Sequence, residues 1–449
     1  MKYNSLEFAL AVSGVCGSAF DKNKIITKVS SDSRNITGEG NLFVALRGDR
    51  FDGHSFVGEI TKDGNNFALI EDPAFSGENT ILVPDVRAAL YSLAVKHRTE
   101  ALGDKKCVAI TGSVGKTSTK EYANAVFSSK YKVYKSPGNQ NSYTGLPMVM
   151  LNCEDNSDYL VLELGMNTAG EISKLSNLVK PDLGIITNIG WSHSEYLGGR
   201  DKIFEEKLDI TVGMNGGILV VNGDDDMLSG KIERGCKVVR CSVENKKSDF
   251  YCTDIVQDSE GLRFKINGKD LFIRQAGVHN VKNSMLAYAA GVLSGISHEE
   301  AADALSSIPA KECRMKVRQG KNQCNVIEDC YNAAPESMKA ALDYLKTQSN
   351  KRIAVLGDML ELGDTSEKLH KEVGSYAADC CDELVCFGEL GSYIASGALE
   401  SGMKNVKFFP FSKREEFVAE IKEIAYDCTI LFKASNRMRF PEIIKTIQL

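Results

Sequence analysis

Short apolar runs alternate with amphipathic stretches through the middle of the chain. Helices are expected at 117–129, 170–179 and 201–213, and continuous Val- and Ile-rich strands at 106–111, 159–164, 183–189 and 217–222. Continuous apolar strands joined by helices are typical of parallel strands that are covered on both faces. This part of the sequence therefore predicts a parallel sheet between two layers of helices.

The segments before and after this middle part follow other patterns. Before it, short apolar strands at 42–46, 67–70 and 81–83 precede one helical run from 85 to 102, which predicts a small α/β domain. After it, residues 237–275 contain short alternating strands with hairpin signals at Gly261 and Asn267-Gly268. Helices are then expected at 281–294 and 298–306.

A further alternation of strands and amphipathic helices begins near Arg314. Its strands are expected at 324–329, 352–356, 383–387, 406–409 and 429–433, which predicts a second parallel-sheet unit. The fold class is therefore α/β. We expect three domains, covering residues 1–104, 105–311 and 312–449.

Composition and charge narrow the possible partners. The chain has 449 residues, 43% of them hydrophobic, and 54 basic against 60 acidic side chains give a net charge of −6. Without clustered positive charge, a nucleic acid or an anionic membrane is not expected as a partner, which leaves small molecules. No apolar run has the length of a membrane helix, and residues 1–14 lack the features of a signal peptide. We expect a cytoplasmic monomer whose 13 cysteines, none in a C-x-x-C pair, stay reduced.

The strongest chemical signal is a glycine-rich turn between an expected strand and an expected helix. Backbone N–H groups in such a turn bind phosphate oxygens, a lysine adds positive charge, and a hydroxyl can bind Mg2+. The turn departs from the usual spacing, because Ile110 stands where the first glycine is expected. The alternative is a strand-to-helix turn with an incidental lysine. The predicted ATP-binding residues of this turn are Gly112, Ser113, Val114, Gly115, Lys116 and Thr117.

Several longer motifs carry a family resemblance over the whole chain. They occupy residues 30–56, 111–121, 138–147, 163–172, 187–198, 205–210, 277–289, 329–342 and 355–363. In these motifs the sequence resembles the Mur ligase family, ATP-dependent enzymes that form amide bonds in peptidoglycan precursors. The resemblance implies a UDP-sugar-binding α/β domain, a P-loop ATPase domain and a Rossmann-like C-terminal domain.

Within the family, the sequence most resembles the branch that adds D-alanyl-D-alanine to UDP-N-acetylmuramoyl-tripeptide. The segments VLGDMLELG (355–363) and YNAAPESM (331–338) favour this branch, and no D-N-P-R motif of the branch that adds a single amino acid is present. That second branch remains the alternative within the enzyme class. A nucleotide-switched protein that hydrolyses ATP without ligation is the alternative from another class.

The resemblance also implies a metal centre and catalytic residues. Glu163 closes one buried strand and His193 follows another, at the sheet edge where ligands bind, and both would hold Mg2+ together with Thr117. Lys207 matches a lysine that carbon dioxide converts to a carbamate able to bind a second Mg2+, although Asp209 stands where the family usually has Glu. Catalytic roles are expected for Lys116, His193 and Lys207. The plainer readings are a capping or ion-paired Glu163, a loop His193 and a solvated Lys207.

Two groups of residues are expected to bind the nucleotide substrates. For ATP, the resemblance assigns Asn283 to the base, Arg314 to phosphate and Asp329 to ribose, near His279, Asn280 and Asn332. Helix capping by the asparagines and an Arg314–Asp329 surface ion pair are the alternatives. For the UDP substrate it assigns Ser31, Asp32, Ser33, Arg34, Asn139 and Asn141, all of them also common turn formers. Asn436 replaces the usual Arg after Lys433, and Arg437 follows it.

Overall fold

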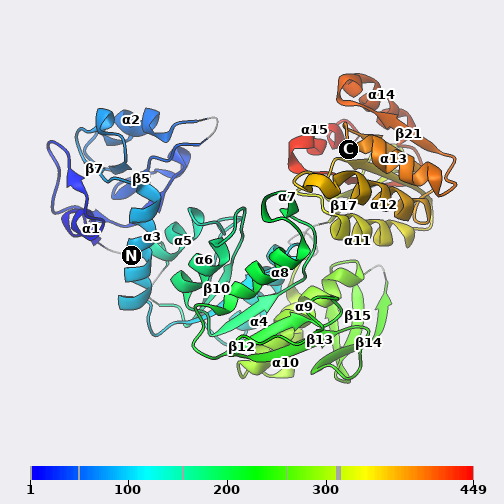
Figure 1. Cartoon of the computed structure of the whole chain (residues 1–449), viewed down its shortest axis with the longest axis horizontal. Coiled ribbons are helices and arrows are strands. Elements are labelled where there is room, and N and C mark those ends of the chain that lie inside the picture. Colours follow the sequence, from blue (N-terminus) through cyan, green and yellow to red (C-terminus); the bar gives the residue numbers. More distant parts are fainter. Residues whose placement is uncertain (1–2, 49–50, 154–155, 259, 310–314, 448–449) are drawn as a thin grey trace.

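A computed structural model of the chain describes residues 3–48, 51–153, 156–258, 260–309 and 315–447. Each of its three parts is built around its own β-sheet of five, nine or six strands. The first and third parts lie on opposite sides of the central part (Figure 1). Among the described residues, no helix combines the length and the hydropathy needed to span a membrane.

The first part is a five-stranded sheet with helices. Its strand order is β2 (Val15–Cys16), β7 (Thr80–Leu82), β6 (Phe67–Ile70), β5 (Asn41–Val44) and β4 (Lys28–Ser30), parallel except for β2. The helices are α1 (Ser5–Ala11), α2 (Val57–Thr61) and α3 (Val86–Glu100). Asp85 caps α3, because its carboxylate accepts a hydrogen bond from the Ala88 N–H at 2.9 Å. The small α/β unit expected from the sequence is therefore present.

Helix α3 attaches the first part to the central part. It packs on α5 (Gly145–Leu151) and α6 (Glu171–Val179), and the apolar core is continuous across this contact. Arg98 is buried and donates from Nε to the Val179 carbonyl at 2.8 Å. Asn152 exchanges two hydrogen bonds with the backbone of Val29, at 2.9 and 2.7 Å. The two parts are joined by polar as well as apolar contacts.

The central part contains the nine-stranded sheet, and the expected parallel sheet is confirmed. Its order is β16 (Lys269–Ile273), β15 (Leu262–Ile266), β14 (Phe250–Gln257), β13 (Lys237–Ser242), β12 (Ile218–Asn222), β11 (Leu183–Ile186), β8 (Lys106–Thr111), β10 (Tyr159–Glu163) and β9 (Val133–Lys135). The seven strands from β14 to β9 in this order, which include β8, are parallel. Strands β14, β15 and β16 form antiparallel hairpins. Asn267 and Gly268, with φ of 49° and 78°, form the second hairpin turn that the sequence predicts.

Helices cover both faces of this sheet. One face packs against α4 (Lys116–Ser128), α9 (Val278–Leu293) and α10 (His298–Ser307), and the other against α5, α6 and α8 (Arg200–Leu208). Helix α8 is shorter than the expected 201–213, because a 3-10 turn over Asp209–Thr211 ends it. Strand β11 stops at Ile186, because Thr187 and Asn188 instead hydrogen-bond to the glycine-rich turn.

The third part is a six-stranded sheet of mostly parallel strands. The order is β17 (Lys316–Gln319), β18 (Asn325–Glu328), β22 (Cys428–Lys433), β19 (Lys351–Gly357), β20 (Glu383–Phe387) and β21 (Val406–Phe409), with only β17 antiparallel. Helices α11 (Pro335–Lys346), α12 (Ser366–Ala378) and α13 (Gly391–Glu400) cover one face. Helices α14 (Arg414–Ile424) and α15 (Phe440–Ile444) cover the other. The domain boundaries after residues 104 and 311 stay predictions, and the second falls outside the described residues.

Candidate active site

The glycine-rich turn lies between β8 and α4, as its sequence predicts. Gly112 and Gly115 have φ of 144° and 86°, which favour glycine. A Cβ atom at Gly112 would lie 1.9 Å from Thr187 Oγ1, and one at Gly115 would lie 2.7 Å from Asn283 Oδ1. The turn therefore needs glycine at both positions, for backbone conformation and for space.

Asn188, which follows β11, holds the turn in place. Its side-chain oxygen accepts from the Val114 N–H at 3.0 Å, its amide donates to the Val114 carbonyl at 3.1 Å, and its backbone carbonyl accepts from Ser113 at 3.1 Å. The Lys116 ammonium donates to the Gly112 and Ser113 carbonyls at 2.7 and 3.1 Å. Because the turn also starts helix α4, it combines a helix N-terminus with a cation, which together suit a phosphate group.

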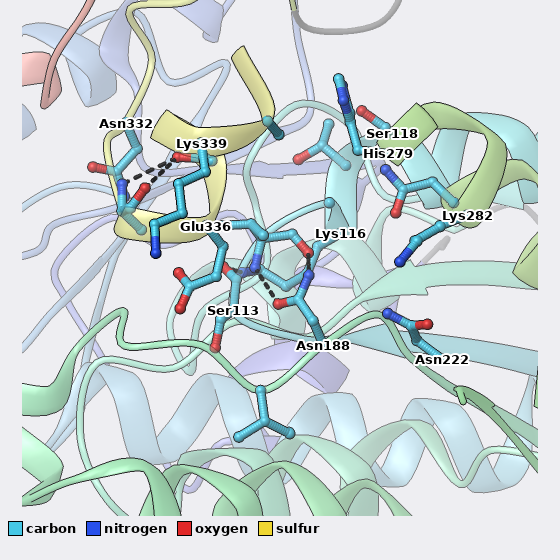
Figure 2. Close-up of a pocket in the computed structure, with 18 of the residues that line it drawn as sticks. Ser113, Lys116, Ser118, Asn188, Asn222, His279, Lys282, Asn332, Glu336 and Lys339 are labelled. Atoms are coloured by element: carbon cyan, nitrogen blue, oxygen red, sulfur yellow. Dashed lines mark hydrogen bonds between the residues drawn. The ribbon is translucent and has the colours of Figure 1, made fainter. Parts of the chain in front are cut away.

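The turn opens into a cavity of about 960 Å3 between the central and third parts. Figure 2 shows Asn332, Glu336 and Lys339 of the third part on one side of Lys116, and His279, Lys282 and Asn222 of the central part on the other. The predicted site residues that line this cavity are Ser113, Val114, Gly115, Lys116, Thr117, Asn139, Asn141, Glu163, His193, Lys207, Asn283 and Asp329. The fold thus brings together residues that are up to 216 positions apart, from Ser113 to Asp329.

Glu163 ends strand β10 at the floor of the cavity. Its residue is 2% exposed, and its two carboxylate oxygens accept hydrogen bonds from Thr117 Oγ1 at 3.0 Å and Asn141 Nδ2 at 2.7 Å. Mg2+ prefers oxygen ligands and often shares nucleotide phosphates with one or two carboxylates. The hydroxyl and the carboxylate therefore fit a magnesium ion bound beside a triphosphate in the adjoining turn.

His193 lies on the loop between β11 and α7 (Ser194–Leu197), in a left-handed conformation with φ of 67°. Its Nδ1 atom lies 2.8 Å from Glu361 Oε2 of the third part, a contact of ion-pair length but without hydrogen-bond geometry. The His193 contact is the largest influence that lowers the pKa of Glu361. His193 therefore lines the cavity while its ring faces a carboxylate of another domain.

Lys207 is 2% exposed and lies on α8. Burial, reinforced by the positive charge of Lys116, lowers its pKa well below the ordinary value for lysine. The neighbouring Glu206 carboxylate accepts from the backbone N–H groups of Gly170 and Ile172, at 2.8 and 3.0 Å, at the start of α6. A neutral amine is the form that reacts with carbon dioxide, so this environment suits the carbamate that the resemblance implies.

The predicted ATP residues are divided between two walls of the cavity. Asn283, on α9, packs against Gly115 of the turn, and burial lowers the pKa of the nearby His279. Asp329, after β18, forms a 2.6 Å ion pair with buried Lys433, which also donates to the Asn332 carbonyl at 3.0 Å. The Asn280 side chain donates to the Ala276 carbonyl at 2.7 Å at the start of α9. Arg314 lies outside the described residues.

The residues predicted for the UDP substrate are not gathered in one place. Asn141 contacts Glu163, and Asn139 is exposed at the cavity rim. The segment Ser31–Arg34 lies in the first part, and it does not contribute to the described lining of the cavity. There Asp32 accepts three hydrogen bonds from Arg34, at 3.0, 2.9 and 2.7 Å, which lower the pKa of Asp32 to about 2.

Residues of the third part contact the loop that follows Asn188, the residue that holds the glycine-rich turn in place. Glu336, in the first turn of α11, accepts from the Trp191 N–H at 3.2 Å, and burial raises its pKa. A Cβ atom at Gly190 would lie 2.6 Å from the Glu336 carboxyl carbon, so a larger residue there would displace the Glu336 carboxylate. Trp191 itself packs against the core of the third part, and the Ser194 hydroxyl donates to the Leu362 carbonyl at 3.3 Å.

The sequence did not single out several residues that structure this cavity, among them Lys120, Asn188, Glu336 and Glu361. The motif positions gave a weak signal for two of them. Asn188 lies near the end of the strand predicted at 183–189, at the ligand-binding edge, and Lys120 lies one helical turn after Lys116. Glu336 and Glu361 act across a domain interface, which periodicity within one segment does not reveal.

Comparisons with known proteins identify the family of the chain. Residues 110–291 match the family model of the Mur ligase middle domain, and residues 313–436 match that of the Mur ligase, glutamate ligase domain. The UDP-N-acetylmuramoyl-tripeptide–D-alanyl-D-alanine ligase of Bacillus subtilis (strain 168) is 38% identical over 447 residues, covering 97% of this chain and 96% of that protein. The protein of the same name from Escherichia coli (strain K12) is 32% identical over 434 residues, covering 94% and 93%.

Solved structures show the same architecture. A crystal structure of MurF from Acinetobacter baumannii matches with a TM-score of 0.86 at 28% identity, covering 99% of this chain and 98% of that chain. The MurF ligase from Thermotoga maritima in complex with ADP matches with a TM-score of 0.79 at 26% identity, covering 94% and 96%. The chain belongs to the Mur ligase family, as its matched domain models and its full-length relatives show.

Proposed function

We propose that this protein is an ATP-dependent ligase that joins D-alanyl-D-alanine to UDP-N-acetylmuramoyl-tripeptide in peptidoglycan precursor synthesis. The observation that carries the proposal is the location of the phosphate-binding turn. Lys116 faces a cavity with walls from both the central and the third part, in a chain 38% identical over nearly its whole length to a ligase of that name. A cavity between two domains can hold a nucleotide and two further reactants.

The first step of the proposed reaction activates a carboxylate, which is by itself a poor electrophile. A terminal carboxylate oxygen of the tripeptide attacks the γ-phosphorus of ATP, the bond to the bridging oxygen breaks, and ADP leaves. The N–H groups at the start of α4 and the Lys116 ammonium stabilise the negative charge that develops on the phosphate oxygens. Thr117, Glu163, His193 and carbamylated Lys207 are the proposed holders of Mg2+, which would neutralise phosphate charge when bound.

In the second step, the amine of D-alanyl-D-alanine attacks the carbonyl carbon of the acyl phosphate. The tetrahedral intermediate collapses, the bond from carbon to the phosphate oxygen breaks, and inorganic phosphate leaves with the amide formed. An acyl phosphate hydrolyses readily in water, so a cavity enclosed by the third part protects it. Asn283, Asp329 and Arg314 are the proposed contacts to the remainder of ATP, and Ser31, Asp32, Ser33, Arg34, Asn139 and Asn141 to the UDP substrate.

The proposal is tested by measuring ADP formation and product mass with a panel of substrates. The panel combines UDP-muramoyl dipeptide, lysine-containing tripeptide and diaminopimelate-containing tripeptide with D-alanyl-D-alanine, D-alanine or no amine. We expect ADP and a pentapeptide product only with a tripeptide and D-alanyl-D-alanine together. Addition of one amino acid to the dipeptide would favour the other branch of the family, and ADP release without both substrates would favour a nucleotide switch. Size-exclusion chromatography with light scattering tests the proposed monomer.

A further inference from the structure

Lys120 is a buried lysine to which neither the sequence nor the proposed reaction gives a role. It lies on α4, one helical turn after Lys116, and is 1% exposed. Its ammonium donates to the carbonyl oxygens of Ser136 and Gly138, both at 3.0 Å, and lies 3.9 Å from Glu163 Oε2. A buried charge is costly unless it is paired and hydrogen-bonded, and here both hydrogen bonds lead to one segment.

The two carbonyls belong to the segment 136–141, which follows β9 and contacts the end of β10. Ser136 is fixed there, because its N–H donates to the Val161 carbonyl and its hydroxyl accepts from the Glu163 N–H, both at 3.1 Å. Five residues later, Asn141 donates to Glu163 Oε1 at 2.7 Å. Lys120 therefore bonds to the segment at Ser136, the first point at which the segment contacts Glu163, and at Gly138, before the second point at Asn141.

The remaining acidic neighbour of Lys120 has another partner. Glu121 Oε1 lies 3.5 Å from the Lys120 ammonium, but its other carboxylate oxygen accepts a hydrogen bond from Lys135. Lys135 therefore already neutralises the charge of Glu121, and it lies closer to this carboxylate than Lys120 does. The contacts that distinguish Lys120 are those to the segment 136–141 and to Glu163.

We propose that Lys120 is a positioning residue of the metal–nucleotide site, which holds the segment 136–141 so that Asn141 orients the Glu163 carboxylate toward the cavity. Thr117 binds the other oxygen of the same carboxylate, so α4 supplies two of the groups that set its orientation. This inference rests on the proposed role of Glu163 as a ligand of Mg2+. Residues that orient a metal ligand typically change metal affinity or activity about 10- to 100-fold when removed.

The test is ADP binding to the full chain by isothermal titration calorimetry, with excess Mg2+ and with EDTA. The ratio of the two affinities isolates the contribution of the metal and needs neither muramoyl substrate nor dipeptide. For Lys120→Met we expect this ratio to fall about 10- to 100-fold, with binding in EDTA unchanged within about twofold. Lys120→Arg, which keeps a cation and its donors, should recover part of the ratio.

Lys130→Met is the matched control, because Lys130 also donates to a backbone carbonyl, that of Gly295 at 2.5 Å, but follows the opposite end of α4 and is exposed. It should bind as the parent protein does. Circular dichroism and thermal melting show whether each variant is folded. If Lys120→Met does not fold, Lys120→Gln takes its place. Because this variant can still donate to one carbonyl, we expect its ratio to fall by the lower end of the range, about 10-fold.

An unchanged ratio in a folded Lys120→Met or Lys120→Gln protein would overturn the inference, as would an equal loss of affinity with and without the metal. Glu163→Gln separates this inference from the assignment beneath it. If Glu163→Gln keeps the full effect of Mg2+, the proposed ligand is wrong whatever Lys120 does. If Glu163→Gln removes the effect, adding Lys120→Met should cause no further loss, because the two residues act through one carboxylate.

Discussion

The ammonium nitrogen of Lys207 lies 3.9 Å from the thioether sulfur of Met166, an uncharged partner that cannot neutralise it. Lys116 adds a second positive charge to the same cavity, which further disfavours the charged amine. A lysine in this position is costly as a cation. As a carbamate it would become an anion that Lys116 and a metal ion both attract.

We predict that Lys207→Ala is nearly inactive and that acetate restores part of its activity. The added carboxylate would occupy the volume and supply the charge of the missing carbamate. The measurement is ADP formation across an acetate titration at fixed ionic strength. Lys202→Ala, which removes an exposed lysine from the same helix, should keep full activity, since a surface lysine contributes at most about 1 kcal/mol through ion pairing.

Lys116→Ala provides the second control for that titration, because acetate should not rescue it. Full activity of Lys207→Ala without acetate would remove Lys207 from the metal centre. The glycine-rich turn and Glu163 would keep their proposed roles in that case.

Lys116→Ala is itself a prediction. Removing one group that stabilises transition-state charge costs about 3 to 4 kcal/mol, which lowers kcat roughly 10²- to 10³-fold. Lys116 lies at the surface of the cavity rather than in the core, so we expect the far-ultraviolet circular dichroism of the variant to match that of the parent. Turnover close to that of the parent, in a folded variant, would contradict the assignment of this turn to phosphate binding.

Local patterns predicted much of the fold, because each element buries its own apolar face. The strands 67–70, 383–387 and 406–409 have the predicted bounds. The helix expected at 201–213 was too long, because Asp209–Thr211 turns away at the end of α8. The sequence did not predict the edge strand Lys316–Gln319. This strand forms by pairing with Asn325–Glu328, and its own pattern of apolar residues does not indicate that pairing.

For the site, the sequence predicted residues whose chemistry is local and missed those that act across the fold. Motifs identified the turn at 112–117 and the carboxylate Glu163. They could not show that Glu361 faces His193, because one lies in the third part and the other in the central part. Likewise, the sequence alone does not distinguish Lys120 from other charged residues on a helix. Its burial is explained by its hydrogen bonds to the segment 136–141.

The third part contacts the central part through a loop next to the glycine-rich turn. Glu336 binds the Trp191 N–H, Glu361 lies against His193, and Trp191 packs on the core of the third part. We predict that an ATP analogue and the UDP substrate together draw the third part toward the turn and reduce the radius of gyration. Small-angle X-ray scattering with neither, either or both ligands measures this change. Lys116→Ala should show a smaller response at the same ligand concentrations.

An identical scattering profile at saturating concentrations of both ligands would indicate a rigid, preformed cavity. The Glu336→Ala variant makes a second comparison within the same experiment. It removes a contact with the Trp191 backbone, so its scattering without ligands should change if this contact sets the distance between the two parts.

His370 makes the stability of the third part depend on pH. It is fully buried on α12, its Nδ1 donates to the Ser366 carbonyl at 2.7 Å, and its Nε2 accepts from the Met359 N–H at 2.9 Å. Burial lowers the pKa of His370 from 6.5 to about 4. Below pH 6.5 His370 therefore binds a proton in the unfolded chain, whereas in the folded chain it binds one only as the pH approaches about 4. The stability that neutral His370 contributes is present above pH 6.5 and is lost as pH falls toward 4.

We predict that His370 lowers the free energy of unfolding by about 2 kcal/mol between pH 7 and pH 5, at 1.36 kcal/mol per pKa unit. Asp358 opposes this trend, because burial raises its pKa to about 6 and the folded state binds its proton more tightly. The difference between the parent and His370→Gln isolates the histidine. Urea denaturation followed by the fluorescence of Trp191, the only tryptophan, reports on the core against which it packs. The parent should lose more stability than His370→Gln on acidification, and parallel pH curves for the two proteins would show that His370 does not cause the effect.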